Sequence, residues 1–579
     1  MPGAADFVQR TVHALEAGGL AVWIKRGLVV AVLIFLAGYY LWHFRGLATS
    51  DAMDQAQVAR HIATGHGWST SLARPLAVGV LKSHGKNVAS QIWVDTYNAP
   101  LPPLVNAIAL VAVKSHLEMS ANTMIYAGDK AIAVTAVIFF FLSVIVLFFI
   151  ARRLFDQRLA IYACALVLLS DTIWQYSMSG LPQMLLLFLF NVTLYFLVRA
   201  VQAKYEAEAT PIIPWLAAAG LGFGLLALSH ALTIWIFLAA LIFSVFYFRP
   251  RGIAAGVLLG AFAIVYVPWM IRTIVVSGSP AGMAWYALFD NVNKSEAAWM
   301  RYLSFDPESI GWGAFRAKFT GNVISQFNRI FEYLGWNVVA MSFFVALLHP
   351  FKRLETSGIR WLVLSMWGGA VVGMIVYGLS EEQGYAANQL HLLFIPIMIC
   401  YGFAFLMVQW SRLELTFPFA RAAFITGLFL LCSFPMLNTM VLSGRKPLIM
   451  WPPYVPPYIA VMRSWMQPNE IITSDMPWAI AWYADRRSVW LPDTVQNFTE
   501  LSDYKTLGNS ISALYLTPIS GSNNKYGDIV KGEYKDWGGI IQHTSNLEKF
   551  SLKYPTLALG VNEECVFISD TDRTKIKPK

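Results

Sequence analysis

Residues 131–150 read AIAVTAVIFFFLSVIVLFFI, twenty positions without a charged side chain. A helix of this length crosses the roughly 30 Å hydrocarbon core of a bilayer, so the stretch predicts a transmembrane helix. Similar apolar runs lie at 28–42 and 252–271. Of the 579 residues, 57% are hydrophobic and 13% are charged, against a charged share of about 25% in soluble domains. The composition therefore excludes a soluble cytosolic protein and predicts a polytopic α-helical membrane protein.

Outward from this run, the apolar pattern predicts about eleven transmembrane helices. They are expected at 27–44, 131–151, 159–176, 181–198, 212–229, 231–248, 253–275, 334–350, 361–378, 389–409 and 421–442. Basic residues cluster in alternate connections, for example Lys25 and Arg26 before the first span and Arg152 and Arg153 after the second. Because cytoplasmic loops carry the excess of Lys and Arg, the pattern predicts a cytoplasmic N-terminus. These clusters also account for the net charge of +9 without a nucleic-acid partner.

The connections on the opposite side include three long regions, 45–130, 276–333 and 443–579. In the first of them, the short apolar run Leu101–Val113 is expected to lie along the membrane surface, because counting it as a span would invert every later charge cluster. The last region alternates short apolar strings with loop or helix patterns, which predicts a small α/β domain. The strings lie at 470–474, 488–491, 513–517 and 566–569. We therefore expect a transmembrane core over 1–442 and an extracytoplasmic domain over 443–579.

The most informative polar stretch follows the first predicted span. Residues 49–70 read TSDAMDQAQVARHIATGHGWST, in which Ser50 or Asp51 is expected to cap a helix that ends before Gly65. Asp51 would then lie at the non-cytoplasmic mouth of the span, where the positive end of the helix favours an ionised carboxylate. Such a group could accept a proton, although an isolated Asp in this place is more often only an N-cap. Asp54, on the same helical face, is expected to be solvated.

The order of motifs along the chain resembles that of the GT-C glycosyltransferases, in particular the branch of protein mannosyltransferases and aminoarabinose transferases. The motifs are Asp51 after the first span, the helix with Ala59 and Arg60, Gly65-His66-Gly67, YNAPLPPL at 97–104, ARRLF at 151–155, the stretch 176–186 and Phe394-Ile395-Pro396. Together they cover most of residues 28–440 in order and spacing. Residues 474–486 also resemble the outer domain that many bacterial members carry.

This resemblance implies inverting transfer of a sugar from a polyprenyl-phosphate-linked donor to an extracytoplasmic acceptor, which would be a protein, a lipid or a glycan. Asp51 aligns with the family's catalytic base, and one positioned carboxylate contributes about 10²–10⁴-fold to a rate. The resemblance also implies a bacterial inner membrane, a periplasmic C-terminal domain and membrane lipid as a further partner. It implies no required cofactor.

The leaving lipid phosphate needs cationic or hydrogen-bonding groups. Arg272 is the preferred cation because it closes the seventh predicted span on the outer side, although its side chain could instead reach lipid headgroups. Asn388 and His391 open the tenth span, where family members often place an arginine that faces the donor; a histidine satisfied at the interface is the simpler interpretation of His391. The other cations on the same face are Arg74, Lys82, Lys86, Lys130, Arg301, Arg316 and Lys318.

Two positions depart from the family pattern. Gln183 aligns with an acid early in the fourth span; a glutamine can position a substrate but cannot bind a proton at neutral pH, and Asp171 could take the place of the acid. In the Pro-rich motif, Asn98 or Leu101 stands where members often have a lysine. The alternative is therefore a non-catalytic GT-C subunit of a membrane complex. A transporter is less favoured, since paired halves and broken mid-bilayer spans are missing from the pattern.

Two further features have a functional and a structural interpretation. His61 and His66 could bind a divalent metal with Asp51, but their i, i+5 spacing puts the two rings on different helix faces, and we expect no metal site. The loop 276–333 interleaves aromatic residues with cations. It would suit a lid over a lipid-linked sugar, or equally an amphipathic loop at the membrane interface.

Overall fold

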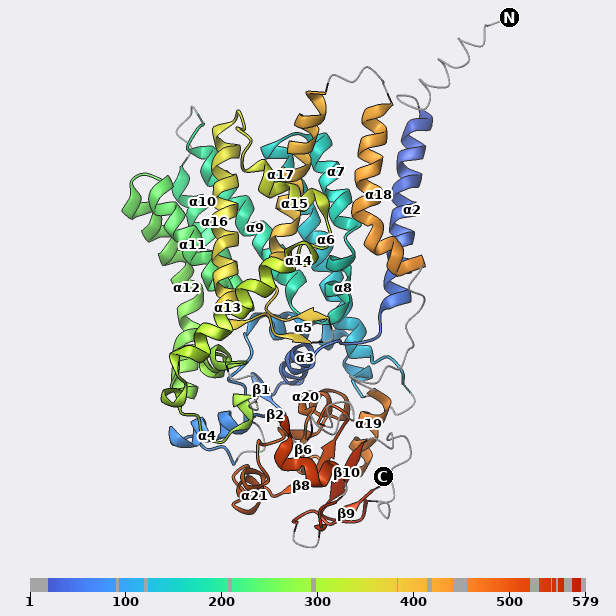
Figure 1. Cartoon of the computed structure of the whole chain (residues 1–579), viewed down its shortest axis with the longest axis vertical. Helices are drawn as coiled ribbons and strands as arrows, with labels where there is room; N and C mark the ends of the chain where they lie inside the picture. Colours follow the sequence, from blue (N-terminus) through green and yellow to red (C-terminus); the bar gives the residue numbers. More distant parts are fainter. Residues whose placement is uncertain are drawn as a thin grey trace, which may run out of the picture.

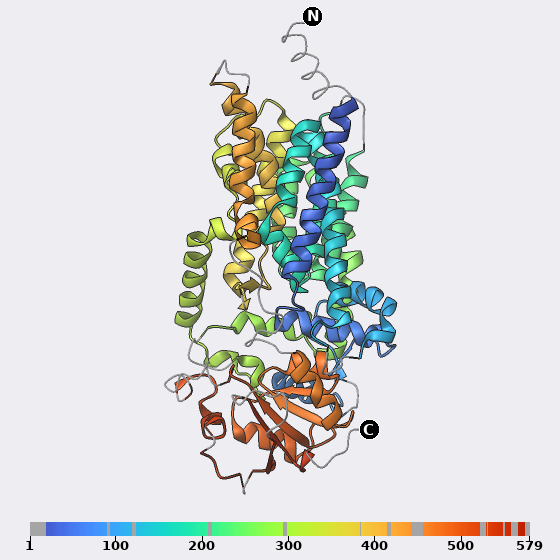
Figure 2. The same cartoon turned by 90° about the vertical axis from the view of Figure 1, so that its right-hand side faces the viewer.

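The computed structural model forms three layers along its long axis: a bundle of long helices, a layer of short helices, and a six-stranded sheet (Figures 1 and 2). It describes residues 19–89, 93–118, 123–206, 211–292, 298–382, 384–413, 419–441, 456–520, 529, 531–542, 544–547, 550–556 and 565–573.

The bundle consists of apolar helices. They are α2 (Gly19–His43), α6 (Ala127–Leu154), α7 (Gln157–Leu168), α8 (Asp171–Ser179), α9 (Gln183–Ala203), α10 (Ile212–Ser229), α11 (Thr233–Tyr247), α12 (Arg251–Ser277), α15 (Val338–Ala346), α16 (Leu354–Tyr377), α17 (His391–Ser411) and α18 (Ala420–Val441). Within the described residues, seven helices are long and apolar enough to cross a membrane, and α7 with α8 makes an eighth if this bent pair is one span. The chain is thus a multi-pass membrane protein.

The eleven expected spans do not all correspond to long straight helices. The stretch 159–176 becomes α7 and α8, which meet at an angle of 55°. The stretches 231–248 and 334–350 contain α11 and α15, of 15 and 9 residues. Apolar periodicity does not reveal such breaks, because the residues on both sides of them are equally hydrophobic. The number eleven stays a prediction.

Burial differs strongly between the helices of the bundle. In α17, every residue from His391 to Ala404 is buried, and Gly402 lets α15 approach so closely that a Cβ there would lie 1.8 Å from the Val339 carbonyl oxygen. In contrast, α12 and α18 bury only 22% of their most apolar windows. Exposed apolar helix surface is stable against hydrocarbon, where a helix already satisfies its own backbone hydrogen bonds. These two helices therefore have the surface expected of lipid-facing positions.

The sheet has the order β2-β7-β6-β8-β10-β9. Its strands are β2 (Leu72–Ala73), β6 (Ile471–Ser474), β7 (Arg487–Trp490), β8 (Ile511–Leu516), β9 (Tyr554–Pro555) and β10 (Val566–Ser569). The first four in this order pair in parallel, while β10 runs antiparallel to β8 and β9. All residues of β6, β8 and β10 are buried, as in strands that are covered on both faces. The edge strand β2 comes from the first loop, so the sheet is not made by the C-terminal region alone.

Short helices and turns connect the bundle with the sheet. The middle layer contains α3 (Ser50–Ala63), α4 (Pro75–Ser83), α5 (Leu101–Ala112), η2 (Gly282–Phe289), η3 (Trp299–Arg301), α13 (Trp312–Asn328), α14 (Ile330–Tyr333), and the strand pairs β1 (Ser69–Thr70) with β3 (Trp93–Val94) and β4 (Glu381–Glu382) with β5 (Tyr385–Ala386). Around the sheet lie α19 (Pro456–Trp465), α20 (Pro477–Ala479), the π-helical turn η5 (Ile480–Ala484) and α21 (Val495–Asp503). The helix α3 contacts α5 of the middle layer and α20 and η5 beside the sheet. Ala48, just before α3, donates from its backbone N–H to the Ser179 carbonyl oxygen at the end of α8, so the start of α3 lies where the three layers meet (Figure 2).

Candidate active site

A cavity of about 480 Å³ lies where the bundle meets the middle layer and the sheet. Its walls come from α3, the Pro-rich part of the first loop, the ends of α10, α12 and α16, the second long loop and the C-terminal region. Six of the residues singled out from the sequence line it: Asp51, Asp54, Arg74, Asn98, Arg272 and Asn388. The fold thus brings together residues that are up to 337 positions apart in the chain.

Asp51 lies in the first turn of α3 and does not cap the helix. The cap is Thr49, whose Oγ1 accepts a hydrogen bond of 3.3 Å from the Ala52 backbone N–H. Ser50 donates from its backbone N and its hydroxyl to Glu382 Oε2, at 2.8 and 2.5 Å. The helix ends before Gly65, which has a positive φ of 90°. Because Thr49 caps the helix, the Asp51 carboxyl is not needed as a cap, and Asp51 lines the cavity.

The Asp51 carboxyl is in an environment that favours its neutral form. Burial, together with the neighbouring carboxyl groups of Glu382, Asp54 and Asp290, raises its pKa to about 7. Within the described part of the chain, no group donates a hydrogen bond to it. With its pKa near 7 the carboxyl is partly protonated at neutral pH, whereas the sequence led us to expect a carboxylate that stays ionised. A carboxyl that titrates near neutral pH is suited to accept a proton in catalysis.

Asp54 is buried and paired, not solvated as the sequence suggested. Its Oδ2 accepts from the Arg74 guanidinium at 2.6 Å and from Asn98 Nδ2 at 2.9 Å. Its Oδ1 accepts from Gln57 Nε2 at 3.0 Å. Because buried charges need partners of this kind, Asp54 and Arg74 neutralise each other beside Asp51. Asn98 fastens the Pro-rich stretch to α3.

Arg272 and Asn388 line the cavity on the side of the bundle. The Nη1 of Arg272 donates to the Asp95 carbonyl oxygen at 3.1 Å, and its guanidinium lies 4.5 Å from the centroid of the Trp269 ring. Asn388 Nδ2 donates to the Gly378 carbonyl oxygen at 2.9 Å. Both side chains are held by protein contacts at the ends of membrane helices. Arg272 in particular is not left to extend towards lipid headgroups.

Three other residues proposed from the sequence hold the helices of the bundle and do not line the cavity. Gln183 Nε2 donates to the Ala387 carbonyl oxygen at 2.8 Å. Asp171 accepts from the Tyr39 hydroxyl at 2.6 Å and so connects α8 with α2. His391 accepts through Nδ1 from Trp367 Nε1 at 3.1 Å. None of them is among the residues that line this cavity, so Asp171 is not in a position to replace the missing acid.

Arg301 connects the second long loop with the C-terminal region. Its side chain is fully buried, donating through Nε to the Leu491 carbonyl oxygen at 2.7 Å and through Nη2 to that of Pro492 at 3.1 Å. Its Nη1 forms an ion pair of 2.7 Å with Glu533. With these three partners, the guanidinium is used for packing the loop against the sheet. A role in binding the donor phosphate is not supported by this position.

The histidines of the first loop do not form a metal site with Asp51. His61 Nδ1 bonds to the Ser69 hydroxyl at 2.7 Å and Nε2 to the Ser71 hydroxyl at 2.9 Å. Burial, with the nearby Arg60 charge, lowers the pKa of His61 to about 4. Across the residues that the structure describes, no group of three or more His, Cys, Asp or Glu side chains could hold a metal ion.

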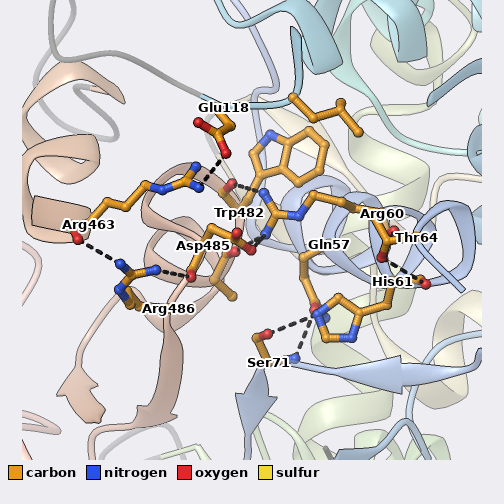
Figure 3. Close-up of polar contacts among 12 residues, drawn as sticks. Gln57, Arg60, His61, Thr64, Ser71, Glu118, Arg463, Trp482, Asp485 and Arg486 are labelled. Atoms are coloured by element: carbon orange, nitrogen blue, oxygen red, sulfur yellow. Dashed lines mark hydrogen bonds and ion pairs between the residues drawn. The ribbon is translucent and has the colours of Figure 1, made fainter. Parts of the chain in front are cut away.

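Arg60 attaches the helix of Asp51 to the C-terminal region (Figure 3). It donates to the Trp482 and Ala481 carbonyl oxygens at 2.7 and 2.5 Å and pairs with Asp485 at 2.8 Å. Trp482 in turn donates from Nε1 to Asp129 at the start of α6, at 2.7 Å. The far end of α3 is therefore fixed between the bundle and the sheet.

Several residues of the cavity have no counterpart among the sequence candidates. They are Asp290 from the second loop, His230 between α10 and α11, and Trp478, Trp490 and Glu533 from the C-terminal region. Two sequence signals pointed towards them: the resemblance of residues 474–486 to an outer domain, which contains Trp478, and the possible lid 276–333, which contains Asp290. The others could not be found from sequence, because their proximity to Asp51 depends on how the sheet packs on the middle layer.

The chain is similar to known proteins in part of its sequence and in its fold. Residues 119–271 match the family model described as dolichyl-phosphate-mannose-protein mannosyltransferase. A comparison with curated protein sequences finds no match.

Among solved structures, ArnT from Cupriavidus metallidurans, bound to undecaprenyl phosphate, is 12% identical with a TM-score of 0.52, covering 94% of this chain and 98% of that chain. The archaeal oligosaccharyltransferase AglB from Archaeoglobus fulgidus, in complex with an inhibitory peptide and a dolichol-phosphate, is 13% identical with a TM-score of 0.52, covering 89% and 72%. Its apo form has a TM-score of 0.54. At these identities the structures establish a shared fold.

The fold and the matched segment agree with the order of motifs along the chain. The chain therefore shares the fold of these two membrane enzymes and carries, over residues 119–271, a segment similar to the dolichyl-phosphate-mannose-protein mannosyltransferases.

Proposed function

We propose that this chain is a membrane glycosyltransferase that moves a sugar from a polyprenyl-phosphate-linked donor to an extracytoplasmic acceptor, with inversion at the anomeric carbon. The observation that carries the proposal is the Asp51 carboxyl, which lies in a cavity at the ends of the membrane helices with its pKa raised to about 7. Two proteins of similar fold were solved with undecaprenyl phosphate or dolichol-phosphate, which supports a lipid phosphate as the carrier.

Asp51 would act as the general base. It takes the proton of the acceptor hydroxyl as the hydroxyl oxygen bonds to the anomeric carbon of the donor sugar. The bond from that carbon to the phosphate oxygen breaks, and the polyprenyl phosphate leaves with the electron pair. Arg272 and Asn388, at the bundle side of the cavity, would stabilise the charge that develops on the phosphate.

The membrane arrangement is part of the proposal. Arg152 and Arg153 lie in the last turn of α6, whose first turn contacts the sheet region through Asp129. The basic cluster is therefore at the end of the bundle opposite the cavity. By the positive-inside rule, the cavity and sheet would face the periplasm of a bacterial inner membrane.

Replacement of the proposed base tests the function. A strain deleted for the chain is complemented with wild type, Asp51→Asn, or the control Asp503→Asn at the exposed end of α21. We expect Asp51→Asn to lower transfer at least ~10²-fold, because the amide cannot accept the proton. Mass spectrometry should then show accumulated lipid-linked sugar, whereas Asp503→Asn should behave as wild type. Equal transfer by Asp51→Asn and wild type, at equal protein levels, would falsify the role of Asp51.

The same experiment addresses the non-catalytic alternative. That alternative was based on Gln183, but the Gln183 amide bonds to the Ala387 carbonyl oxygen and does not line the cavity. A glutamine in place of the family's acid at position 183 therefore does not remove a carboxylate from the residues that line the cavity. A purely structural subunit predicts indifference to Asp51→Asn and tight co-purification with other membrane proteins.

A further inference from the structure

The two sides of the cavity differ in chemistry, and the difference bears on the acceptor. The bundle side contains Arg272 and Asn388 at the ends of membrane helices. A lipid-linked donor has to arrive on this side, because its carrier stays in the bilayer. The opposite side is formed by Trp478 and Trp490 of the C-terminal region and by Asp290 of the second loop. An acceptor that comes from outside the bilayer would approach from this side.

Two indole rings form a corner on the acceptor side. Trp490 ends β7, and Trp478 lies in α20, the short helix that follows β6. Their ring centroids are 5.6 Å apart and their planes make an angle of 83°. Both side chains are partly exposed and both line the cavity. Trp490 belongs to a strand of the sheet and Trp478 to the short helix directly after another strand, so the buried sheet holds both rings.

Two residues that line the cavity each have a buried polar side-chain atom without a hydrogen-bond partner in the described structure. One is a donor, Nε1 of Trp490, and the other is an acceptor, Oδ1 of Asp290. Buried polar atoms are almost always hydrogen-bonded, so each such exception needs an explanation. An unpaired donor and an unpaired acceptor on residues that line the same cavity would both be satisfied by a ligand that supplies both kinds of group once the two side chains turn towards it.

The chemistry of these groups selects a carbohydrate. Aromatic faces carry negative charge, which attracts the C–H groups on the face of a pyranose ring. Hydroxyl groups both donate and accept, so they can satisfy Asp290 and the Trp490 indole together. A phosphate group would be repelled by the carboxyls of Asp290 and Glu533, and an acyl chain would leave both polar atoms unpaired.

Resting on the function proposed above, we propose that Trp478, Trp490 and Asp290 bind a carbohydrate acceptor, so that the sugar is transferred to a glycan hydroxyl. The hydroxyl of the bound pyranose gives its proton to Asp51, its oxygen bonds to the donor's anomeric carbon, and the polyprenyl phosphate departs with the electron pair of the broken bond. Asp290 is one of the carboxyl groups whose charge acts on Asp51. A pyranose bound to Asp290 would therefore lie beside the base.

Binding can be measured without a donor. Saturation-transfer difference NMR on the full chain in detergent would use the methyl glycosides of mannose, glucose, galactose and N-acetylglucosamine, with a threonine-containing hexapeptide as the competing class. We expect saturation of the ring protons of at least one glycoside. Trp478→Ala and Trp490→Leu should each weaken its binding about fivefold, since one aromatic contact contributes roughly 1 kcal/mol. Trp312→Ala is the matched control, because Trp312 is 73% exposed on α13 and does not line the cavity.

Asp290→Asn covers the case in which a tryptophan variant fails to fold. It keeps the shape of the side chain but removes its negative charge and replaces one of the two acceptor oxygens with an NH2 donor. We expect it to weaken glycoside binding as well. Binding of the peptide but of no glycoside would overturn the proposal, as would glycoside binding that all three cavity variants leave unchanged. Failure of the proposed function looks different: Asp51→Asn would then retain transfer, whereas glycoside binding at the tryptophan corner would persist.

Discussion

At the scale of single residues, the protonation of Asp51 predicts how activity depends on pH. Its pKa is raised to about 7, first by burial and then by Glu382 and other carboxyls. The protonated carboxyl cannot accept a proton, so transfer should fall as the pH is lowered through about 7. Glu382→Gln removes one of the negative charges and keeps an acceptor for Ser50. We expect it to shift the acidic limb of the pH–rate profile to lower pH.

The control for this shift is Glu355→Gln, in the first turn of α16. This turn is at the other end of the helix from Tyr377, which lines the cavity. A profile that is the same for wild type and Glu382→Gln, or that moves equally in Glu355→Gln, would contradict the assignment of the acidic limb to Asp51.

The same residues show how far sequence could predict the site. Asp51, Arg272 and Asn388 were found because each lies near the end of an expected span, and such ends meet at one membrane surface. Asn98 was found through the Pro-rich motif of the family resemblance. The raised pKa of Asp51 was not predictable, since it depends on Glu382, 331 positions later. Gln183 and Asp171 were expected at the site but do not line the cavity. Their positions in the family pattern indicate that each lies near a helix end, but not the direction in which the side chain points.

At the scale of the elements, the contacts of Arg60 predict that the C-terminal region stabilises the helix that carries Asp51. Arg60→Met removes two hydrogen bonds to carbonyl oxygens and the ion pair with Asp485, whose side chain is 41% exposed. We expect a loss of about 2 kcal/mol, because the carbonyls are left buried while Asp485 can be hydrated. Transfer should fall as well, since the far end of α3 is released. Thermal unfolding in detergent measures the first effect.

Arg463→Met provides the matched comparison. Arg463 pairs with Glu118, whose side chain is 80% exposed, and an exposed pair contributes about 0–1 kcal/mol. If both arginine variants unfold at the same temperature as wild type, Arg60 does not hold α3 in place.

The elements also show where sequence patterns are insufficient. Runs of apolar residues predicted the long helices because length and hydropathy decide them locally. The bend between α7 and α8 and the pairing of β2 with β7 are decided by tertiary contacts. The pair Leu72–Ala73 is too short to be recognised as a strand, and it becomes one only because Ser488 and Val489 lie beside it.

At the scale of the whole molecule, the three layers predict which parts are accessible from each side of the membrane. Tyr504, at the end of α21, is 78% exposed on the sheet side, and Arg353 precedes α16 at the opposite end of the bundle. In a Cys565→Ser background the remaining cysteines, Cys164, Cys400 and Cys432, are buried, so Tyr504→Cys and Arg353→Cys can be labelled selectively. If the cavity faces the periplasm, a membrane-impermeant maleimide should label only Tyr504→Cys in cells whose outer membrane has been opened. Both variants should react after the inner membrane is also permeabilised. Labelling of Arg353→Cys before that step would mean that the opposite orientation is correct and that the cavity meets its acceptor on the cytoplasmic side.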